Sequence, residues 1–408
     1  MATETRSKAS GAEKPEDFII KLQQEGRALP ENQDSEPLIA PDEVNEEDAV
    51  QLQEVGVFTD QRERSGTFVM QDFHTVSAMS LVDGLELLPI HVALETYDWL
   101  QEQYYFKAVP ADKNERTAFV AAQDVPQGYF IRVKAGAEIT LPCQTALYIS
   151  KENIAQAVHN IVVLEEGASL KLITGCISHR KVPSGIHMAV SEMYIGKNAT
   201  LTSTMVHSWG EDVVVRPSAG VVVDDGGSYI NNYVSLRPGA DIVSNPTTWL
   251  NGKGSSAKYQ SVILGSEGSR IELGGEVFLN GEGSSAELNH RGVCTGGIIS
   301  QQGILQGNAP CRAHVDCAGM LLDRRDEGYI ESVPGIRALH PEAQMSHEAS
   351  IGRISPEQVE YLMARGMEER EAISMIIRGF LDADIEGLGQ ELDDRIATIA
   401  QMAGHGEG

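Results

Sequence analysis

The chain has 408 residues, of which 41% are hydrophobic, a proportion typical of globular proteins with a buried core. Acidic residues outnumber basic ones by 59 to 32, which gives a formal net charge of −27. A polyanion is repelled by nucleic acid and by anionic membranes, so we expect neither as a partner. The chain begins without an apolar run, and no stretch stays apolar for ~18 residues. The sequence therefore predicts neither a secretion signal nor a membrane span.

Cysteine usage indicates a reducing compartment. There are five cysteines, an odd number, and no secretion signal accompanies them, which is typical of reduced thiols in the cytoplasm. No two of them form a CxxC pair, so a structural zinc site is not expected. They are Cys143, Cys176, Cys294, Cys311 and Cys317.

The first third of the chain shows little regular pattern. Residues 1–80 are acidic and poor in aromatics, and we expect partial disorder with helical pieces around 15–24 and 46–55. Leucine and isoleucine side chains alternate with charged residues over 81–106, which predicts one or two helices in a lead-in segment spanning 81–124.

A repeat begins near residue 125. Glycine or asparagine recurs before a short strand, at intervals of about 14–15 residues or twice that number. These residues supply corners with positive φ. They are Gly136, Gly167, Asn198, Gly226, Gly239, Gly254, Gly268 and Gly283.

The strands that follow these corners alternate apolar and polar residues, as in Leu170 and Leu172 or Ile271 and Leu273. Two such units would form a coil of about 28–30 residues, and stacked coils bury a shared core. We predict a mainly β protein with a right-handed parallel β-helix over 125–345, most clearly over 125–335, and helical regions at both ends. The alternative is an antiparallel sandwich, whose strand spacings are shorter and lack this doubling.

Helical patterns return in a C-terminal region over 346–408. Ser355 and Gln358 resemble a capping box, Pro356 occupies the first helical position, and Gly366 ends the helix. A second helix is expected from about Glu368, and a third one around 392–399.

Candidate metal ligands gather just before this region. Residues 311–348 contain Cys311, His314, Cys317, His347 and Glu348, and thiolate, imidazole and carboxylate are the iron ligands that proteins offer. Cys317 and Glu348 are 31 residues apart, so we expect them about one coil apart, within ~5 Å along the stack. On spacing alone, the sequence favours the alternative interpretation, a buried structural cysteine and a surface His-Glu pair.

The sequence resembles the SufB/SufD family of iron–sulfur cluster assembly proteins. SHEASIGRISPEQVEYLMARGMEEREAISMIIRGF (346–380) is similar to the family's C-terminal signature. VPQGYFIRVKAGAEITLPCQTALYI (125–149) and VVLEEGASLKLITGC (162–176) are similar to its entry into the β-helix. The resemblance covers about 125–380, and it implies a cytoplasmic, non-enzymatic scaffold that carries a transient iron–sulfur cluster. It also implies a C-terminal region that docks an ABC-type ATPase, SufC.

The resemblance assigns roles to individual residues. Cys317 matches the nascent-cluster ligand of SufB, and His347 and Glu348 match the His-Glu pair that faces it. Glu348 favours a SufB-like role, whereas the sequence of the segment 351–354 is more similar to that of SufD. Cys176 matches the residue through which SufB receives sulfur; the alternative interpretation is that Cys176 is only a buried thiol of the core. We expect Cys294 and Cys311 to be buried in the core. For SufC docking we expect Tyr361, Met363, Met375 and Phe380.

The implied partners are SufC, a sulfur donor and apo-protein acceptors. The chain is shorter than SufB of the three-component bacterial system, which suggests a simpler variant that forms a homodimer or a SufB–SufD-like heterodimer. No P-loop is present: GKG at 252–254 lacks the required pattern, so the chain itself is not expected to bind nucleotide. The alternative function is a cytoplasmic β-helix carbohydrate-active enzyme, against which the missing aspartate cluster and the 6% aromatic content argue.

Overall fold

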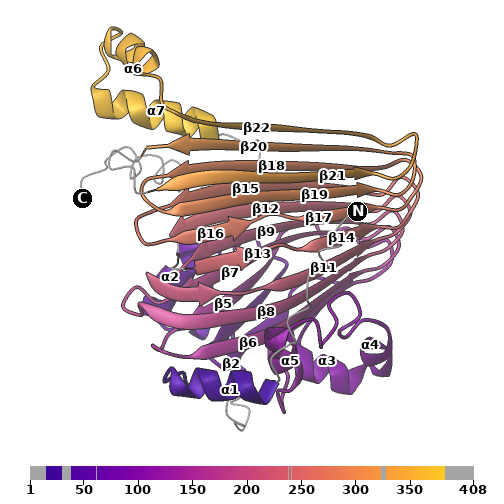
Figure 1. The fold of residues 1–408 in the computed structure, drawn as a ribbon. Coiled ribbons are helices and arrows are strands. Elements are labelled where there is room, and N and C mark those ends of the chain that lie inside the picture. The colour runs from indigo at the N-terminus through magenta and orange to yellow at the C-terminus, as the bar shows by residue number, and fades with distance from the viewer. Residues whose placement is uncertain are drawn as a thin grey trace.

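The computed structural model describes residues 15–29, 38–60, 62–237, 239, 241–322 and 328–381. The third predicted C-terminal helix, around 392–399, lies outside the described residues. The fold is mainly β and forms a β-solenoid of about 7 turns with short helices near its ends (Figure 1). This confirms the predicted fold class and excludes the sandwich, because the strands over the repeat pair in parallel.

Two sheets form opposite walls of the solenoid. The first sheet has, among the described residues, ten strands in the spatial order β2-β1-β5-β7-β9-β12-β15-β18-β20-β22. Their bounds are β1 Gly66–Gln71, β2 His74–Ser80, β5 Cys143–Ile149, β7 Ser169–Ser178, β9 Thr200–Ser208, β12 Ser228–Arg237, β15 Ser256–Gly265, β18 Ser284–Cys294, β20 Cys311–Leu321 and β22 Gln344–Arg353.

The second sheet forms the other wall and ends in β21 beside β19. Its bounds are β3 Leu85–Pro89, β4 Tyr129–Val133, β6 Ala155–Leu164, β8 Ser184–Ile195, β10 Asp212–Val215, β11 Ser218–Val223, β13 Asp241–Ser244, β14 Thr247–Leu250, β16 Arg270–Leu273, β17 Glu276–Leu279, β19 Ile298–Gly307 and β21 Tyr329–Ala338.

The corners carry out the role predicted from the repeat. Gly136, Gly167, Asn198, Gly226, Gly254, Gly268 and Gly283 all have positive φ; Gly239 is the one corner position of the repeat without it. The alternating residues Leu170, Leu172, Ile271 and Leu273 are buried in one continuous core between the sheets. The sequence period therefore set both the corner geometry and the core face.

Short helices cover the outer faces of both sheets. α1 (Pro15–Gln24) and α5 (Glu115–Ala121) pack on β6 and β8, while α3 (Ile90–Thr96) and α4 (Asp98–Gln103) cover β4 and β6. On the first sheet an outward apolar strip is covered by α2 (Glu46–Glu54) near one end and by α7 (Glu369–Leu381) near the other. A 3-10 turn, η1, spans Pro41–Glu43, and α6 spans Pro356–Met363.

The solenoid is longer at both ends than we predicted. β1 and β2 form a hairpin within 1–80, and β1 pairs in parallel with β5, so this stretch belongs to the first sheet. Residues 85–89 form β3 rather than helix, because the segment pairs antiparallel with β4 and covers that sheet edge. At the other end β22 runs to Arg353, beyond the predicted boundary at 345.

The C-terminal helices begin near the predicted positions but differ in capping. Ser355 precedes α6, and Gly366 has a φ of +96° after it. The Ser355 hydroxyl bonds to the Glu357 carboxylate instead of the helix backbone, so the predicted capping box does not form.

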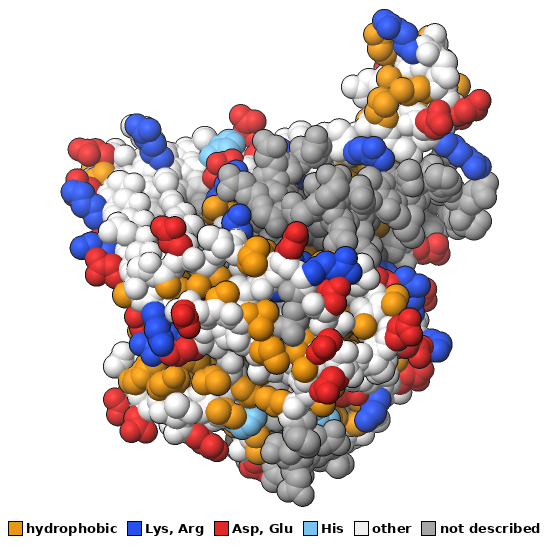
Figure 2. Space-filling view, turned by 180° about the vertical axis from the view of Figure 1, so that it is seen from behind, with side chains coloured by type: hydrophobic (Ala, Val, Ile, Leu, Met, Phe, Trp, Pro, Cys, Tyr) orange, Lys and Arg blue, Asp and Glu red, His pale blue; other side chains and the backbone are white. Residues whose placement is uncertain are grey.

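Figure 1 shows α6 and α7 extending from the β22 end of the solenoid. Figure 2 shows the molecule from behind: charged side chains are spread over this face, and hydrophobic ones gather across its lower half.

Candidate functional site

Cys317 lies inside the solenoid near its C-terminal end. Strand β20 alternates, so Cys311, Val315 and Cys317 face the interior, and all three are buried in the main core. Burial raises the pKa of the Cys317 thiol above its ordinary value, while the Ser332 hydroxyl on β21 acts in the opposite direction. Cys317 is therefore a neutral thiol at physiological pH, and it becomes a good ligand only when it is deprotonated by metal binding.

The interior row that contains Cys317 also contains a histidine. Strand register places Ser261, His290, Cys317 and Ala349 side by side on successive strands of the first sheet. The His290 Nδ1 atom lies 3.0 Å from the Ser261 hydroxyl, and the ring is buried. We did not single out His290 from the sequence. Its distance from Cys317 in the chain, 27 residues, is one coil and could have revealed it.

His347 and Glu348 both lie on β22, the last strand of the first sheet, and both are exposed. They point to opposite faces because side chains alternate along a strand. His347 pairs with Val315 in the interior row, and Glu348 pairs with Asp316 on the outer face. Glu348 and Cys317 are thus on neighbouring strands, as predicted, but on different faces of the sheet.

Asp316 adds a charged contact on that outer face. Its carboxylate forms an ion pair with Arg291 on β18, with Nη2 and Oδ2 separated by 2.5 Å. Across the described ranges, no three side chains of the His, Cys, Asp or Glu type come close enough together to hold a metal ion. Cys317, His347 and Glu348 therefore do not converge within one described chain.

Cys176 lies on β7 and lines a cavity within the solenoid, with a volume of about 60 Å³. Its thiol is buried, and burial raises its pKa to about 12. The same cavity is bordered by His187, His207 and Tyr233, and the His207 Nδ1 atom lies 3.0 Å from the Tyr233 hydroxyl. A sulfur donor cannot reach this thiol without an opening of the wall.

The remaining cysteines are core residues. Cys294 and Cys311 are buried, as predicted, and the Cys294 thiol donates a hydrogen bond to the Gly297 carbonyl at 3.0 Å. Cys143 is also buried, and burial raises its pKa to about 12.

Three of the four predicted docking residues are exposed. Tyr361 is 58% exposed, Met375 49% and Met363 43%, and the Arg365 guanidinium lies 5.0 Å from the Tyr361 ring. Phe380 differs, because it packs with Ile377 against the outward strip of the first sheet. Phe380 therefore helps to hold α7 on the solenoid and is only partly exposed.

Comparisons with known proteins agree with this architecture. Residues 147–380 match the family model described as SUF system FeS cluster assembly, SufBD core domain. The chain is 39% identical over 357 residues to an iron–sulfur cluster assembly SufBD family protein of Archaeoglobus fulgidus, covering 87% of this chain and 95% of the relative.

Two further relatives carry the same description. One from Methanothermobacter thermautotrophicus is 39% identical over 366 residues, or 88% of each chain. One from Pyrococcus horikoshii is 29% identical over 393 residues, or 95% of this chain and 86% of the relative. In the part of the chain that the structure describes, no helix is long and apolar enough to cross a membrane. The chain therefore belongs to the SufBD family, which implies a role in iron–sulfur cluster assembly.

Proposed function

We propose that this chain is a non-enzymatic scaffold on which an iron–sulfur cluster is built and then delivered to apo-proteins. The observation that carries the proposal is the position of Cys317, a buried thiol one strand from the exposed final strand β22. Thiolate ligands hold iron tightly, while imidazole and carboxylate ligands hold it more weakly and permit release. The cluster is cargo in this scheme, and the chain binds no nucleotide itself.

Ligand access requires movement of the last coil. Cys317 is covered on one side by Ala349, an exposed alanine on β22. The strand has a sheet neighbour on one side only, β20, among the described residues. A shift of β22 would expose Cys317 and bring His347 beside it. Glu348, on the outer face, would be the first carboxylate that incoming iron meets.

Sulfur would enter at Cys176. The sulfur of the Cys176 thiol attacks the terminal sulfur of a donor persulfide, and the S–S bond of the donor breaks. The departing donor sulfur takes the proton that the Cys176 thiol loses, and Cys176 becomes the persulfide. Cys176 and Cys317 lie five strand spacings apart, roughly 24 Å, so sulfur has to travel along the interior. Polar residues of one interior row line this route, including Tyr233, Ser261 and His290.

The partners follow from the exposed ends of the molecule. The surface formed by Tyr361, Met363 and Met375 offers adaptable apolar contacts for a SufC-type ATPase, which would supply the work of moving β22. The open edges of β21 and β22 would pair with a second subunit, either another copy or a SufD-like chain, and bring two sets of ligands together. Cytoplasmic action fits the five cysteines, all of which are free.

Anaerobic reconstitution tests the proposal. Purified chain is incubated with ferrous iron, sulfide and a thiol reductant, and bound iron, bound sulfide and visible charge-transfer absorption are measured. The proposal expects a bound cluster that transfers to an apo-ferredoxin, and co-purification with a SufC-type ATPase. A chain that binds no iron and sulfide, or one that cleaves sugar polymers, would contradict the scaffold assignment.

A further inference from the structure

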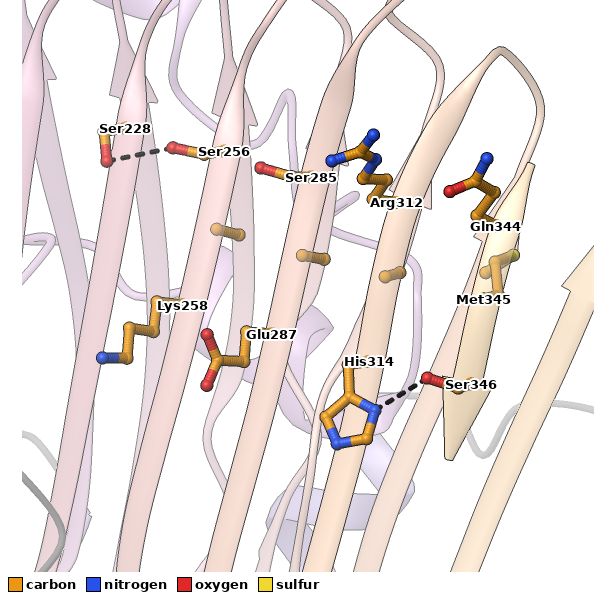
Figure 3. Close-up of a pocket in the computed structure, with 13 residues that line it drawn as sticks. Ser228, Ser256, Lys258, Ser285, Glu287, Arg312, His314, Gln344, Met345 and Ser346 are labelled. Atoms are coloured by element: carbon orange, nitrogen blue, oxygen red, sulfur yellow. Dashed lines mark hydrogen bonds between the residues drawn. The ribbon is translucent and has the colours of Figure 1, made fainter. Parts of the chain in front are cut away.

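A polar groove runs across the outer face of the first sheet, over β12, β15, β18, β20 and β22, with a volume of about 680 Å³ (Figure 3). This volume lies within the range of small-molecule sites, roughly 300–1,000 Å³. The groove is separate from the interior row of Cys317, and the proposed scaffold function makes no use of it.

Two outward rows of side chains define the groove. The row nearest the corners consists of small hydroxyls, Ser228, Ser256 and Ser285, followed by Arg312. The next row carries long side chains on the same strands, which leaves a hollow above the serines. In strand order these are Lys258, Glu287 and His314, followed by Ser346.

Among the described residues, the two cations of the groove have no ion-pair partner. Lys258 and Arg312 form no ion pair with any carboxylate of the described residues, although the chain carries a net charge of −27. Strand register places Glu287 beside Lys258, yet Figure 3 shows the Lys258 side chain directed away from Glu287. The Glu287 carboxylate instead accepts a hydrogen bond of 2.6 Å from the Asn289 amide.

Neighbouring polar groups add hydrogen-bond donors. The Ser256 hydroxyl donates to Ser228 at 3.1 Å, and the Ser285 hydroxyl has no protein partner among the described residues. The Ser346 hydroxyl lies 2.9 Å from the Nδ1 atom of His314. The other nitrogen of that imidazole ring, Nε2, is the polar atom that it could offer to a ligand. A guanidinium, an ammonium and several hydroxyls suit a ligand rich in oxygen acceptors.

The position of Glu287 restricts the shape of that ligand. Lys258 and Arg312 are two strand spacings apart across the sheet and two residues apart along it, a diagonal of roughly 12 Å, and Glu287 lies on the strand between them. A negative charge over the middle of the groove would be repelled by Glu287, whereas a hydroxyl there could donate to its carboxylate. The ligand should therefore have two separated anionic ends and a hydroxylated middle.

We propose that this groove binds a short polyol carrying two terminal anionic groups, either phosphates or carboxylates. Arg312 holds one anionic end in a bidentate contact, Lys258 holds the other, and Glu287 selects for hydroxyl groups between them.

Isothermal titration calorimetry on the full chain tests this site. The probes are fructose 1,6-bisphosphate and glucarate, which separate the phosphate and carboxylate forms of the ligand, with fructose 6-phosphate as the singly phosphorylated comparison. We expect one or both of these doubly ended anions to bind, and the bisphosphate, if it binds, to do so at least ~tenfold more tightly than the monophosphate.

Charge-matched variants locate the binding. Arg312→Gln and Lys258→Gln should each weaken binding of the doubly ended anion at least ~tenfold, while Lys253→Gln should not, because Lys253 is paired with Glu282 outside the groove. Glu287→Gln should admit inorganic tripolyphosphate, whose charge is continuous, more readily than the wild type does.

These side chains lie on the outer face of the sheet and away from the core, so all variants should keep the wild-type thermal unfolding midpoint. Failure of the wild type to bind either fructose 1,6-bisphosphate or glucarate would overturn the proposal, as would an equal loss of binding in Arg312→Gln and Lys253→Gln. Neither measurement involves a cluster, so the result is independent of the scaffold function.

Discussion

Cys317 is the residue whose replacement should be most informative. We expect Cys317→Ala to abolish cluster assembly, because it removes the one thiolate ligand of the proposed set. His347→Ala and Glu348→Ala should reduce assembly, since each removes a weaker ligand on β22. Iron and sulfide content after anaerobic reconstitution is the measurement.

Cys143→Ala is the matched control, since Cys143 is also a buried thiol of the first sheet but lies near the opposite end. It should assemble clusters like the wild type. Loss of one small side chain costs at most a few kcal/mol, so all four variants should fold. Normal assembly by Cys317→Ala would show that the site is elsewhere, even within this family.

Three interior histidines make the stability of the fold sensitive to acid. Burial lowers the pKa of His187 and of His290 to about 4 and that of His207 to about 3. In the unfolded chain a histidine binds a proton near pH 6.5, so between that value and the folded pKa values the unfolded state binds more protons. The free energy of unfolding should fall as pH decreases through this window, on the order of 2 kcal/mol per histidine by about pH 5.

Urea denaturation at pH 7 and at pH 5 measures this effect. His207→Gln should reduce the pH dependence, because glutamine can accept the Tyr233 hydrogen bond without titrating. His347→Ala replaces an exposed ring instead of a buried one and serves as the comparison variant. Equal stability of the wild type at both pH values would show that these rings do not control it.

At the level of elements, α7 has two different faces. Ile377 and Leu381 are buried on the outward strip of the first sheet, whereas Met375 is exposed beside the surface of α6. Deleting 355–408 should therefore abolish binding of a SufC-type ATPase, but it would also uncover apolar residues such as Val262 and Val293 and lower stability.

Point variants separate docking from stability. Tyr361→Ala, Met363→Ala and Met375→Ala should each weaken ATPase binding by about 1–2 kcal/mol, the range of residues that dominate interfaces. Val125→Ala, an exposed apolar position before β4, should have no effect. Surface plasmon resonance with immobilised ATPase measures the change, and unaltered affinity in all three variants would place the docking surface elsewhere.

At the level of the whole molecule, the two ends of the solenoid differ in how the edges of the sheets are covered. Near the beginning of the chain, the hairpin of β1 and β2 and the antiparallel strand β3 cover the sheet edges. At the other end β21 and β22 each pair on one side only within the described residues, and Tyr329, Val333 and Ile351 are exposed there. Unpaired strand edges with apolar side chains favour association.

We therefore expect a dimer formed through the β21–β22 end. Light scattering at micromolar concentration should give twice the mass of the chain, and Ile351→Arg should shift the protein toward the monomer by placing a charge at the edge. Val125→Arg, a similar change near the other end, should remain dimeric. A monomeric wild type would contradict this assembly.

The sequence by itself determined the repeat and most of what depends on it. Positive φ is accessible to glycine and asparagine, so their spacing revealed the corners, and the alternation of Leu170 with Leu172 revealed the buried face. The family resemblance pointed to Cys317 in VDCAGMLL, and to His347 and Glu348 in the signature over 346–380.

Only the tertiary structure decided how these residues face one another. A one-residue difference in register sends a side chain to the opposite face, so spacing of about one coil could not show that Glu348 is outside while Cys317 is inside. Nor could it show that β1 and β3 join the sheets, because their partners β5 and β4 are distant in the chain. The groove beside Glu287 likewise exists only because stacked coils align residues that are about 28 positions apart.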